Sequence, residues 1–165
     1  MNQIDKFDWA ILYELQKNAR LTNAELAQRV GLSAAPCWRR VRALEEAGYI
    51  TGYHATLDRH KLGLGVLAFV RVDAAQNTAD ITLRMEESIR LLPEVTSCHY
   101  ISGAGTFELQ VVAKDLESFS SFIRNVLLHL PNVKDVHTTF SLGEVKSSSA
   151  LPLPMTANPK GAPSR

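Results

Sequence analysis

The chain has 165 residues, enough for one ordinary domain or two small ones. With 45% hydrophobic and 21% charged residues, it has the composition of a globular protein that can bury a core. The formal net charge of +1 excludes a strong overall field for nucleic acid or membrane, so any such binding surface has to be local.

The first predicted helix spans residues 5–18, where apolar side chains recur at spacings of three and four. Charges are interspersed throughout this stretch, which excludes a signal peptide, and no window approaches the roughly 18 apolar residues of a membrane span. The two cysteines, Cys37 and Cys98, follow no disulfide or metal spacing. We therefore expect a soluble cytoplasmic protein with no membrane partner and no metal.

The second predicted helix opens with a capping box, in which the Thr22 hydroxyl accepts from a free backbone N–H and Glu25 reaches back to the cap. This helix runs to about Val30, and Gly31 supplies the left-handed residue that ends it. Ser33 is then a ready N-cap for a third helix.

Pro36 fits only the first turn of that third helix, where a missing N–H costs nothing, and Gly48 ends it. Two short helices joined by a Gly-containing turn, with another helix in front, form the helix-turn-helix pattern. Residues 49–57 are aromatic and β-branched with glycine between, which predicts a small hairpin, or wing. A winged helix-turn-helix domain is thus predicted over residues 1–57.

A linker over residues 58–65 leads to a second predicted domain over residues 66–146. Its elements are strands at 66–73, 95–102, 107–113 and 133–142, and helices at about 78–92 and 116–130. The order βαββαβ is ferredoxin-like, so the fold class is α+β. Both helices then cover one sheet face, and a second copy of the chain is the simplest cover for the other. The proline-containing tail, 147–165, is predicted to be disordered.

The third helix has a candidate DNA-binding face. At about 100° per residue, the inner stripe comprises Cys37, Val41 and Leu44, and the opposite face presents Ala35, Arg39 and Arg42. The second helix of a helix-turn-helix enters the major groove, where arginine can bind guanine O6 and N7 and an alanine methyl can meet that of thymine. The alternative is an ordinary solvated helix surface, against which the helix-turn-helix context weighs.

Two further side chains flank the stripe. Arg40 is expected to cover the core with its stem and to pair with Glu45 or Glu25. Trp38 either packs against the first helix or lies on the DNA backbone. Phosphate contacts are expected from the start of the second helix and from the wing. The full set of candidate DNA contacts is Arg20, Thr22, Asn23, Ser33, Ala35, Trp38, Arg39 and Arg42.

Three motifs carry a resemblance to a known family: D..IL..LQ at 8–16, N.ELA..VGLS at 23–33 and C..RV..LE..GYI at 37–50. They closely resemble the leucine-responsive regulatory protein (Lrp)/AsnC family of bacterial transcription regulators, and the resemblance continues to about residue 146. It implies a DNA-binding winged helix-turn-helix, a hairpin linker and an amino-acid-sensing ferredoxin-like domain of the ACT-like, RAM type. It also implies homodimers that assemble into tetramers or octamers, and action at the nucleoid.

The resemblance further implies a small effector, usually an amino acid, near the loop after the domain's second strand. The candidate contacts are His99, Ser102, Gly103, Ala104, Gly105 and Thr106. This loop departs from the family pattern of Ser/Thr-Gly, an acidic residue and a later Asp-Tyr pair, because no aspartate remains to hold an amino group. Free N–H groups and the Thr106 hydroxyl could still capture a carboxylate. The alternative is that the glycines only allow a tight turn.

Two other functions fit this scaffold. Some haem-pathway decarboxylases resemble the family, and a tetrapyrrole enzyme of this kind needs a charged or histidine-lined pocket, whereas the five histidines here are scattered. A stand-alone amino-acid sensor is the other possibility. The arginine face favours a sequence-specific DNA-binding regulator, so we expect no catalytic residues and no cofactor.

Overall fold

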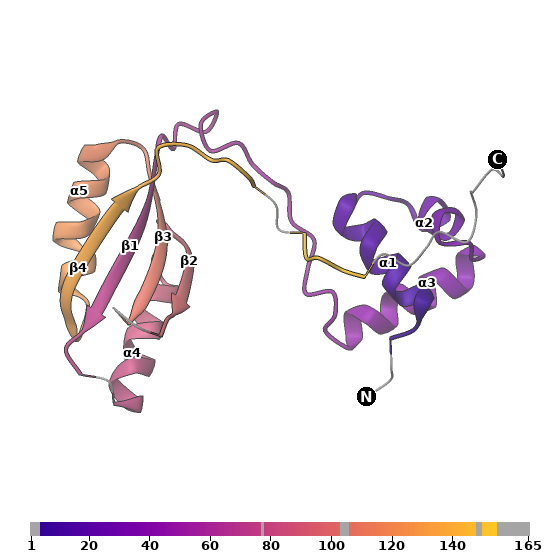
Figure 1. Ribbon diagram of the computed structural model, residues 1–165, viewed down its shortest axis with the longest axis horizontal. Helices are drawn as coiled ribbons and strands as arrows, with labels where there is room; N and C mark the ends of the chain where they lie inside the picture. The colour runs from indigo at the N-terminus through magenta and orange to yellow at the C-terminus, as the bar shows by residue number, and fades with distance from the viewer. Residues whose placement is uncertain (1–3, 77, 103–105, 148–149, 155–165) are drawn as a thin grey trace. The chain divides into compact units, whose positions relative to one another are not determined.

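The computed structural model describes residues 4–76, 78–102, 106–147 and 150–154. The chain divides into two compact units, residues 1–55 with 147–165 and residues 56–146. Within the described ranges, the first unit holds three helices, and the second holds a four-stranded sheet with two α-helices (Figure 1). No helix in these ranges is long and apolar enough to cross a membrane.

The helical unit consists of α1 (Lys6–Lys17), α2 (Asn23–Val30) and α3 (Ala34–Glu46). The predicted capping box at Thr22 and Glu25 is present, and Gly31 has a positive φ of 73° after α2. Their shared core comprises Ile11, Leu15, Leu26, Ala27, Val30, Cys37 and Leu44. The helix-turn-helix pattern is therefore confirmed.

The predicted wing is absent from the structure. Residues 51–58 are exposed and contain no strand, whereas a hairpin was expected over residues 49–57. A two-stranded hairpin with no third strand is marginal in water, which explains the difference. The segment is instead attached to the end of α3, because the Tyr53 hydroxyl donates to Glu45 Oε1 at 2.9 Å. Burial and this hydrogen bond raise the pKa of Tyr53 to about 12.

The second unit follows the predicted βαββαβ order: β1 (Val66–Ala74), α4 (Ala79–Arg90), β2 (Val95–Tyr100), β3 (Phe107–Ala113), α5 (Leu116–Asn125) and β4 (Val133–Phe140). The strands pair antiparallel in the order β2-β3-β1-β4, which confirms the ferredoxin-like fold. One helix is shorter than predicted. It ends at Asn125 and a 3-10 turn, Leu127–His129, follows, because Val126 leaves the helical region and Pro131 forces the residue before it into an extended conformation.

One face of the sheet carries the second core. Side chains of β3 alternate as predicted, with Phe107, Leu109 and Val111 buried. On the opposite face Phe69 is 41% exposed. On that face too, Arg71 Nε and Asp73 Oδ1 are buried without a hydrogen-bond partner among the described residues.

The expected disorder of the tail does not extend to residues 150–154. This short stretch lies against α1, where the side chain of Gln16 makes two hydrogen bonds with the backbone of Leu151. Composition alone predicted disorder because the segment has too few apolar residues to form a core of its own. It is held instead by its contacts with the helical unit.

Candidate nucleic-acid interface

Helix α3 has a buried side and an exposed side, as the predicted stripe requires. Cys37 and Leu44 are buried in the helical unit, and burial raises the pKa of the Cys37 thiol. The opposite side is exposed and carries Ala35, Arg39 and Arg42. Because the inner side anchors the helix, these two guanidinium groups stand in solvent on one face.

Trp38 lies beside Arg42 at the surface. Its side chain is 55% exposed, and the guanidinium carbon of Arg42 lies 5.7 Å from the centre of its ring. Trp38 is therefore not part of the buried core of the helical unit. An aromatic face at this distance attracts the guanidinium and restricts its orientations.

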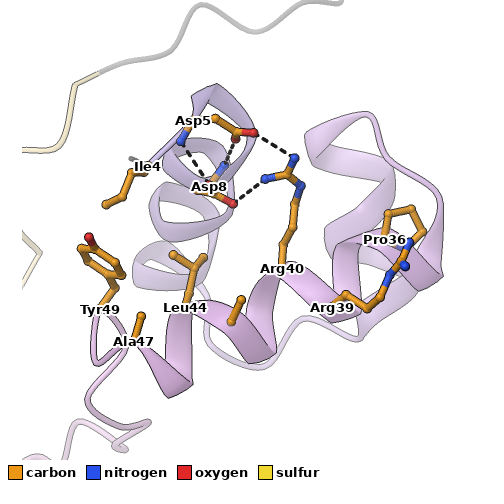
Figure 2. A pocket seen from close by; sticks show the side chains of 10 residues that line it. Ile4, Asp5, Asp8, Pro36, Arg39, Arg40, Leu44, Ala47 and Tyr49 are labelled. Carbon is orange, nitrogen blue, oxygen red and sulfur yellow. Dashed lines mark hydrogen bonds and ion pairs between the residues drawn. The ribbon is translucent and has the colours of Figure 1, made fainter. Parts of the chain in front are cut away.

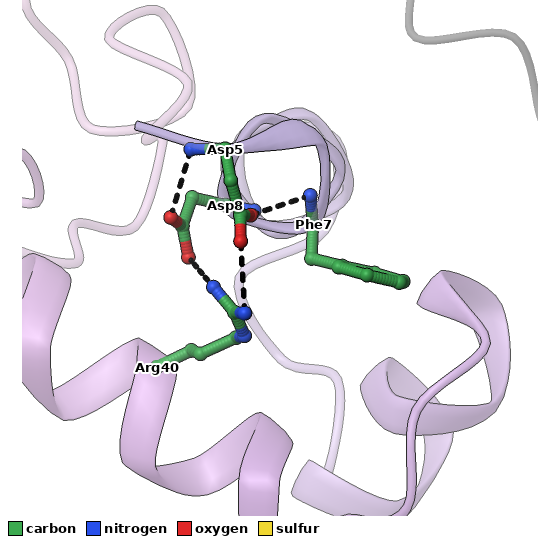
Figure 3. Close-up of polar contacts among 4 residues, drawn as sticks. All are labelled: Asp5, Phe7, Asp8 and Arg40. Carbon is green, nitrogen blue, oxygen red and sulfur yellow. Dashed lines mark hydrogen bonds and ion pairs between the residues drawn. The ribbon is translucent and has the colours of Figure 1, made fainter. Parts of the chain in front are cut away.

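Arg40 braces α3 against the start of α1. Its Nη2 lies 2.8 Å from Asp5 Oδ2, and its Nη1 donates to Asp8 Oδ1 at 2.8 Å (Figure 3). The prediction that Arg40 pairs with Glu45 or Glu25 is wrong. Glu45 accepts from Tyr53 instead, and Glu25 belongs to the capping box of α2. The hydrogen bond that Arg40 donates to Asp8 raises the pKa of Arg40, despite partial desolvation.

The same two aspartates cap α1. Asp5 Oδ1 accepts from the N–H groups of Phe7 at 2.8 Å and Asp8 at 3.0 Å, and Asp8 Oδ2 accepts from the N–H of Asp5 (Figure 3). Burial acts to raise the pKa of Asp5, but these bonds and the charge of Arg40 outweigh it, so the pKa is lowered. One network thus fixes both the start of α1 and the angle of α3.

A cleft of about 610 Å³ lies between the start of α1 and α3. Figure 2 shows Arg40 reaching toward the two aspartates, while Arg39 runs the other way, beside Pro36. The acidic groups of the cleft are therefore already paired with Arg40. Arg39 is the side chain at its rim that remains directed outward.

The residues before α3 hold the turn together. Asn23 Nδ2 donates to the Ala34 carbonyl at 2.8 Å, which joins the first turn of α2 to that of α3. The Thr22 hydroxyl is occupied by Glu25, at 2.8 Å from its Oε2. Ser33 is the N-cap of α3, as predicted, although its side chain makes no capping hydrogen bond.

Arg20 and Ser33 leave their side chains exposed near the same turn. Arg20 uses only its backbone N–H, which donates to Asn18 Oδ1 at 3.0 Å. Of the residues predicted to contact DNA, Thr22 and Asn23 thus have structural roles for their side chains. Thr22 is nevertheless exposed, and the other exposed candidates are Arg20, Ser33, Ala35, Trp38, Arg39 and Arg42.

The predicted effector residues are only partly brought together. His99, on β2, and Ser102 are exposed. Thr106 is 6% exposed, and its hydroxyl accepts from the Ala74 N–H at 3.0 Å, so one role of this side chain is to close the end of β1. The other three candidates, Gly103, Ala104 and Gly105, lie outside the described residues.

A cleft that the sequence did not reveal runs beside β2, between the strand and α4. Its volume is about 430 Å³, and it combines Glu86 and Arg90 of α4 with Cys98 and Tyr100 of β2. Arg90 Nη2 lies 3.7 Å from Glu86 Oε2. Burial, and then the charge of Glu86, raise the pKa of the Cys98 thiol. The cleft therefore offers the carboxylate of Glu86 and the guanidinium of Arg90 to a small polar molecule.

Two known family descriptions match the chain. Residues 4–51 match a winged helix-turn-helix DNA-binding domain, and residues 67–151 match the Lrp/AsnC ligand binding domain. The Bkd operon transcriptional regulator of Pseudomonas aeruginosa is 41% identical over 93% of this chain and 100% of that protein. The leucine-responsive regulatory protein of Escherichia coli is 38% identical over 90% of each chain.

Solved structures agree with these matches. A transcriptional regulator from Neisseria meningitidis, in complex with L-methionine, has a TM-score of 0.86 and 40% identity, over 91% of this chain and 97% of that one. An AsnC family regulator from Agrobacterium tumefaciens has a TM-score of 0.84 and 33% identity, over 90% and 96%. The likeness thus extends over both units.

Proposed function

This chain belongs to the Lrp/AsnC family of DNA-binding transcriptional regulators, and on that premise we propose that α3 reads operator DNA through Arg39 and Arg42. The observation that carries the proposal is their exposure on the face opposite the anchored stripe. Arg20, Ser33 and Trp38 then contact the backbone beside them. The predicted domain roles follow: residues 1–57 bind DNA, 58–65 link, and 66–146 bind effector and oligomerise.

The test compares specific and non-specific binding. Sites are first mapped genome-wide, and the affinity of Arg42→Ala is then measured on a mapped operator and on random DNA. A base contact predicts a loss of about 1–3 kcal/mol on the operator and a smaller loss on random DNA. Arg84→Ala, which removes the same charge from exposed α4, is the control. Equal losses on both DNAs would reduce Arg42 to a phosphate anchor.

The effector is proposed to be an amino acid or a related metabolite. The L-methionine bound by the Neisseria regulator supports this class. The cleft beside β2 supports it independently, because Arg90 can bind a carboxylate and Glu86 an ammonium group. Calorimetric titration with single L-amino acids tests it: Arg90→Gln should weaken binding at least about tenfold. Unchanged affinity would move the effector site away from this cleft.

A homodimer is proposed to form through the uncovered face of the sheet, with tetramers or octamers built from it. Phe69 is exposed there, and Arg71 Nε and Asp73 Oδ1, which have no partner among the described residues, are available to a donor and an acceptor of a second copy. Phe69→Glu should therefore give monomers in light-scattering measurements. A dimer that survives this change would have another interface.

A regulatory rather than enzymatic role is proposed, acting at the nucleoid. Its support is that the relatives named above are regulators and that the exposed face of α3 is basic. A tetrapyrrole titration should give no spectral change. Tight binding with a shifted absorption band would instead support the haem-pathway alternative.

A further inference from the structure

Residues 150–154, Ala-Leu-Pro-Leu-Pro, are held by one side-chain amide. Gln16 Nε2 donates to the Leu151 carbonyl at 3.1 Å, and Gln16 Oε1 accepts from the Leu151 N–H at 3.1 Å. An amide that pairs with both backbone groups of one residue takes the place of a neighbouring strand. The other unit uses the same arrangement between Asn132 and Gln76, at 2.7 and 2.9 Å, to fix the corner between β1 and β4.

The segment docks on the helical unit beside α1 and residues 49–54, and it lines, together with them, a groove of about 540 Å³. One wall is α1, which contributes Trp9 and Leu12, and the other is residues 49–54, directly after α3. The Leu151 side chain is 68% exposed, whereas Leu153 is half-buried. The segment is therefore bound by the backbone of the first leucine and the side chain of the second.

The two prolines restrict the segment before it docks. The Leu153 N–H donates to the Leu151 carbonyl at 2.8 Å, which makes a three-residue turn centred on Pro152. Proline fixes its own φ, and its ring also limits the residue before it, so both leucines have few alternative conformations. Little entropy is lost on docking, and a few contacts are then enough to hold the segment.

We propose that this groove is a docking surface for the chain's own Leu151–Pro154 segment, and that docking holds α1 and residues 49–54 in the form that binds DNA. Residues 49–54 follow the end of α3 closely in the chain. A segment docked beside them therefore supports the end of the recognition helix. The segment follows β4 after a short connection, and its hydrogen bonds with Gln16 attach this part of the chain to the helical unit non-covalently. The inference rests on the DNA-binding role proposed above.

The test removes the segment and measures the groove without DNA. A chain that ends at residue 146 is compared with the full chain, each carrying Trp38→Phe so that Trp9 is the remaining tryptophan. We expect a red shift of Trp9 emission and faster amide exchange at residues 49–54. In chains with Trp38 intact, operator affinity should fall about three- to tenfold on truncation, while far-UV circular dichroism keeps its helical signal.

Two variants of the full chain refine the test. Gln16→Ala should shift Trp9 emission in the same direction, whereas Gln28→Ala, on the exposed side of α2, should not. A synthetic peptide of residues 147–156 should restore the emission of the truncated chain. Unchanged emission and exchange after truncation would overturn the docking surface whatever happens to DNA.

The remaining outcomes separate the two proposals. If truncation shifts the Trp9 signal but leaves operator affinity unchanged, the groove is occupied without controlling DNA binding, and that part of the inference is overturned. If the full-length chain binds no DNA while the Trp9 signal shifts as expected, the proposed function fails and the docking surface stands.

Discussion

The two units of this chain are stabilised by different means. Among the residues that the structure describes, the core of the sheet unit has twelve buried residues and that of the helical unit has seven. The helical unit also depends on capping boxes at α1 and α2, an ion network of Arg40 with two aspartates, and the docked tail. A helix that must present one face to DNA cannot bury that face. The helical unit therefore gains less from apolar burial and more from polar contacts, which respond to charge, salt and pH.

This difference can be measured in one sample. Both tryptophans, Trp9 and Trp38, belong to the helical unit, so tryptophan fluorescence reports on that unit alone. Far-UV circular dichroism reports on both units together. A substitution that shifts the fluorescence transition but not the whole circular dichroism transition therefore affects the stability of the helical unit alone.

Removing core volume from the helical unit should have the largest effect. Ile11 is 0% exposed in the middle of α1, and Ile11→Ala should cost about 2–5 kcal/mol in the free energy of unfolding. In urea, we expect the fluorescence transition to move to lower concentration while a second transition by circular dichroism stays in place. Leu91→Ala, at a position that is 82% exposed, is the control. A shared shift of both transitions would show that the units unfold as one.

Breaking the ion network should have the next largest effect. Arg40→Met keeps the stem but leaves Asp8 unpaired and partly buried, which should cost about 1–2 kcal/mol. A double-mutant cycle with Asp8→Asn should give a coupling energy of about 0.5–1.5 kcal/mol that falls with added salt.

The matched control for this cycle is a second ion pair of the helical unit, in which Arg29 Nη1 lies 3.0 Å from Glu14 Oε2. Half of the Arg29 side chain is exposed, so Arg29→Met should change the unfolding free energy by less than about 0.5 kcal/mol. Equal losses in the two variants would mean that Arg40 is an ordinary surface charge.

The sequence predicted what depends on neighbouring residues and missed what depends on distant ones. The capping box at Thr22 and the glycine ends of the helices use contacts within a few residues, and the alternation on β3 is a local pattern. The partners of Arg40 could not be predicted, because Asp8 is 32 positions away and the sequence contains nearer glutamates that could also pair with Arg40. The docked tail was missed for the same reason, since Gln16 and Leu151 are 135 positions apart.

The candidate sites divide in the same way. The exposed face of α3 follows from helical spacing alone, and the structure confirms its exposure. The cleft beside β2 needs two elements that only the fold brings together, although the i, i+4 spacing of Glu86 and Arg90 was visible. The hydrogen bond from the Ala74 N–H to the Thr106 hydroxyl could not be predicted from the sequence, because the two residues are 32 positions apart.

A smaller effect is expected from Trp38, which is exposed and contributes little to the core of the helical unit. Trp38→Ala should leave the unfolding free energy nearly unchanged but weaken operator binding by about 0.5–1 kcal/mol, because Arg42 loses its aromatic support. The loss should largely disappear when Arg42 is already alanine. Additive losses in a filter-binding cycle would mean that Trp38 contacts DNA independently of Arg42.

The smallest expected effect is the loss of stability of the helical unit at low pH. In the helical unit, the net effect of the cap bonds and Arg40 lowers the pKa of Asp5, and bonds from Thr22 lower that of Glu25. A carboxyl group with a lower pKa in the folded state stabilises the fold above its ordinary value, here 3.8 and 4.5, and loses that contribution as the pH falls through the folded pKa. In the sheet unit, Asp115 has a pKa lowered by its bond from Ser118, but the larger core remains.

The helical unit should therefore unfold at a higher pH than the sheet unit, so that fluorescence changes before circular dichroism is complete. Asp5→Asn isolates the cause, because asparagine is as good an N-cap as aspartate but does not titrate. It should make the fluorescence transition less steep with pH, whereas Glu87→Gln, on exposed α4, should not alter it. If both signals changed at one pH in every variant, acid would act on the whole chain, and the polar supports of the helical unit would not set its stability.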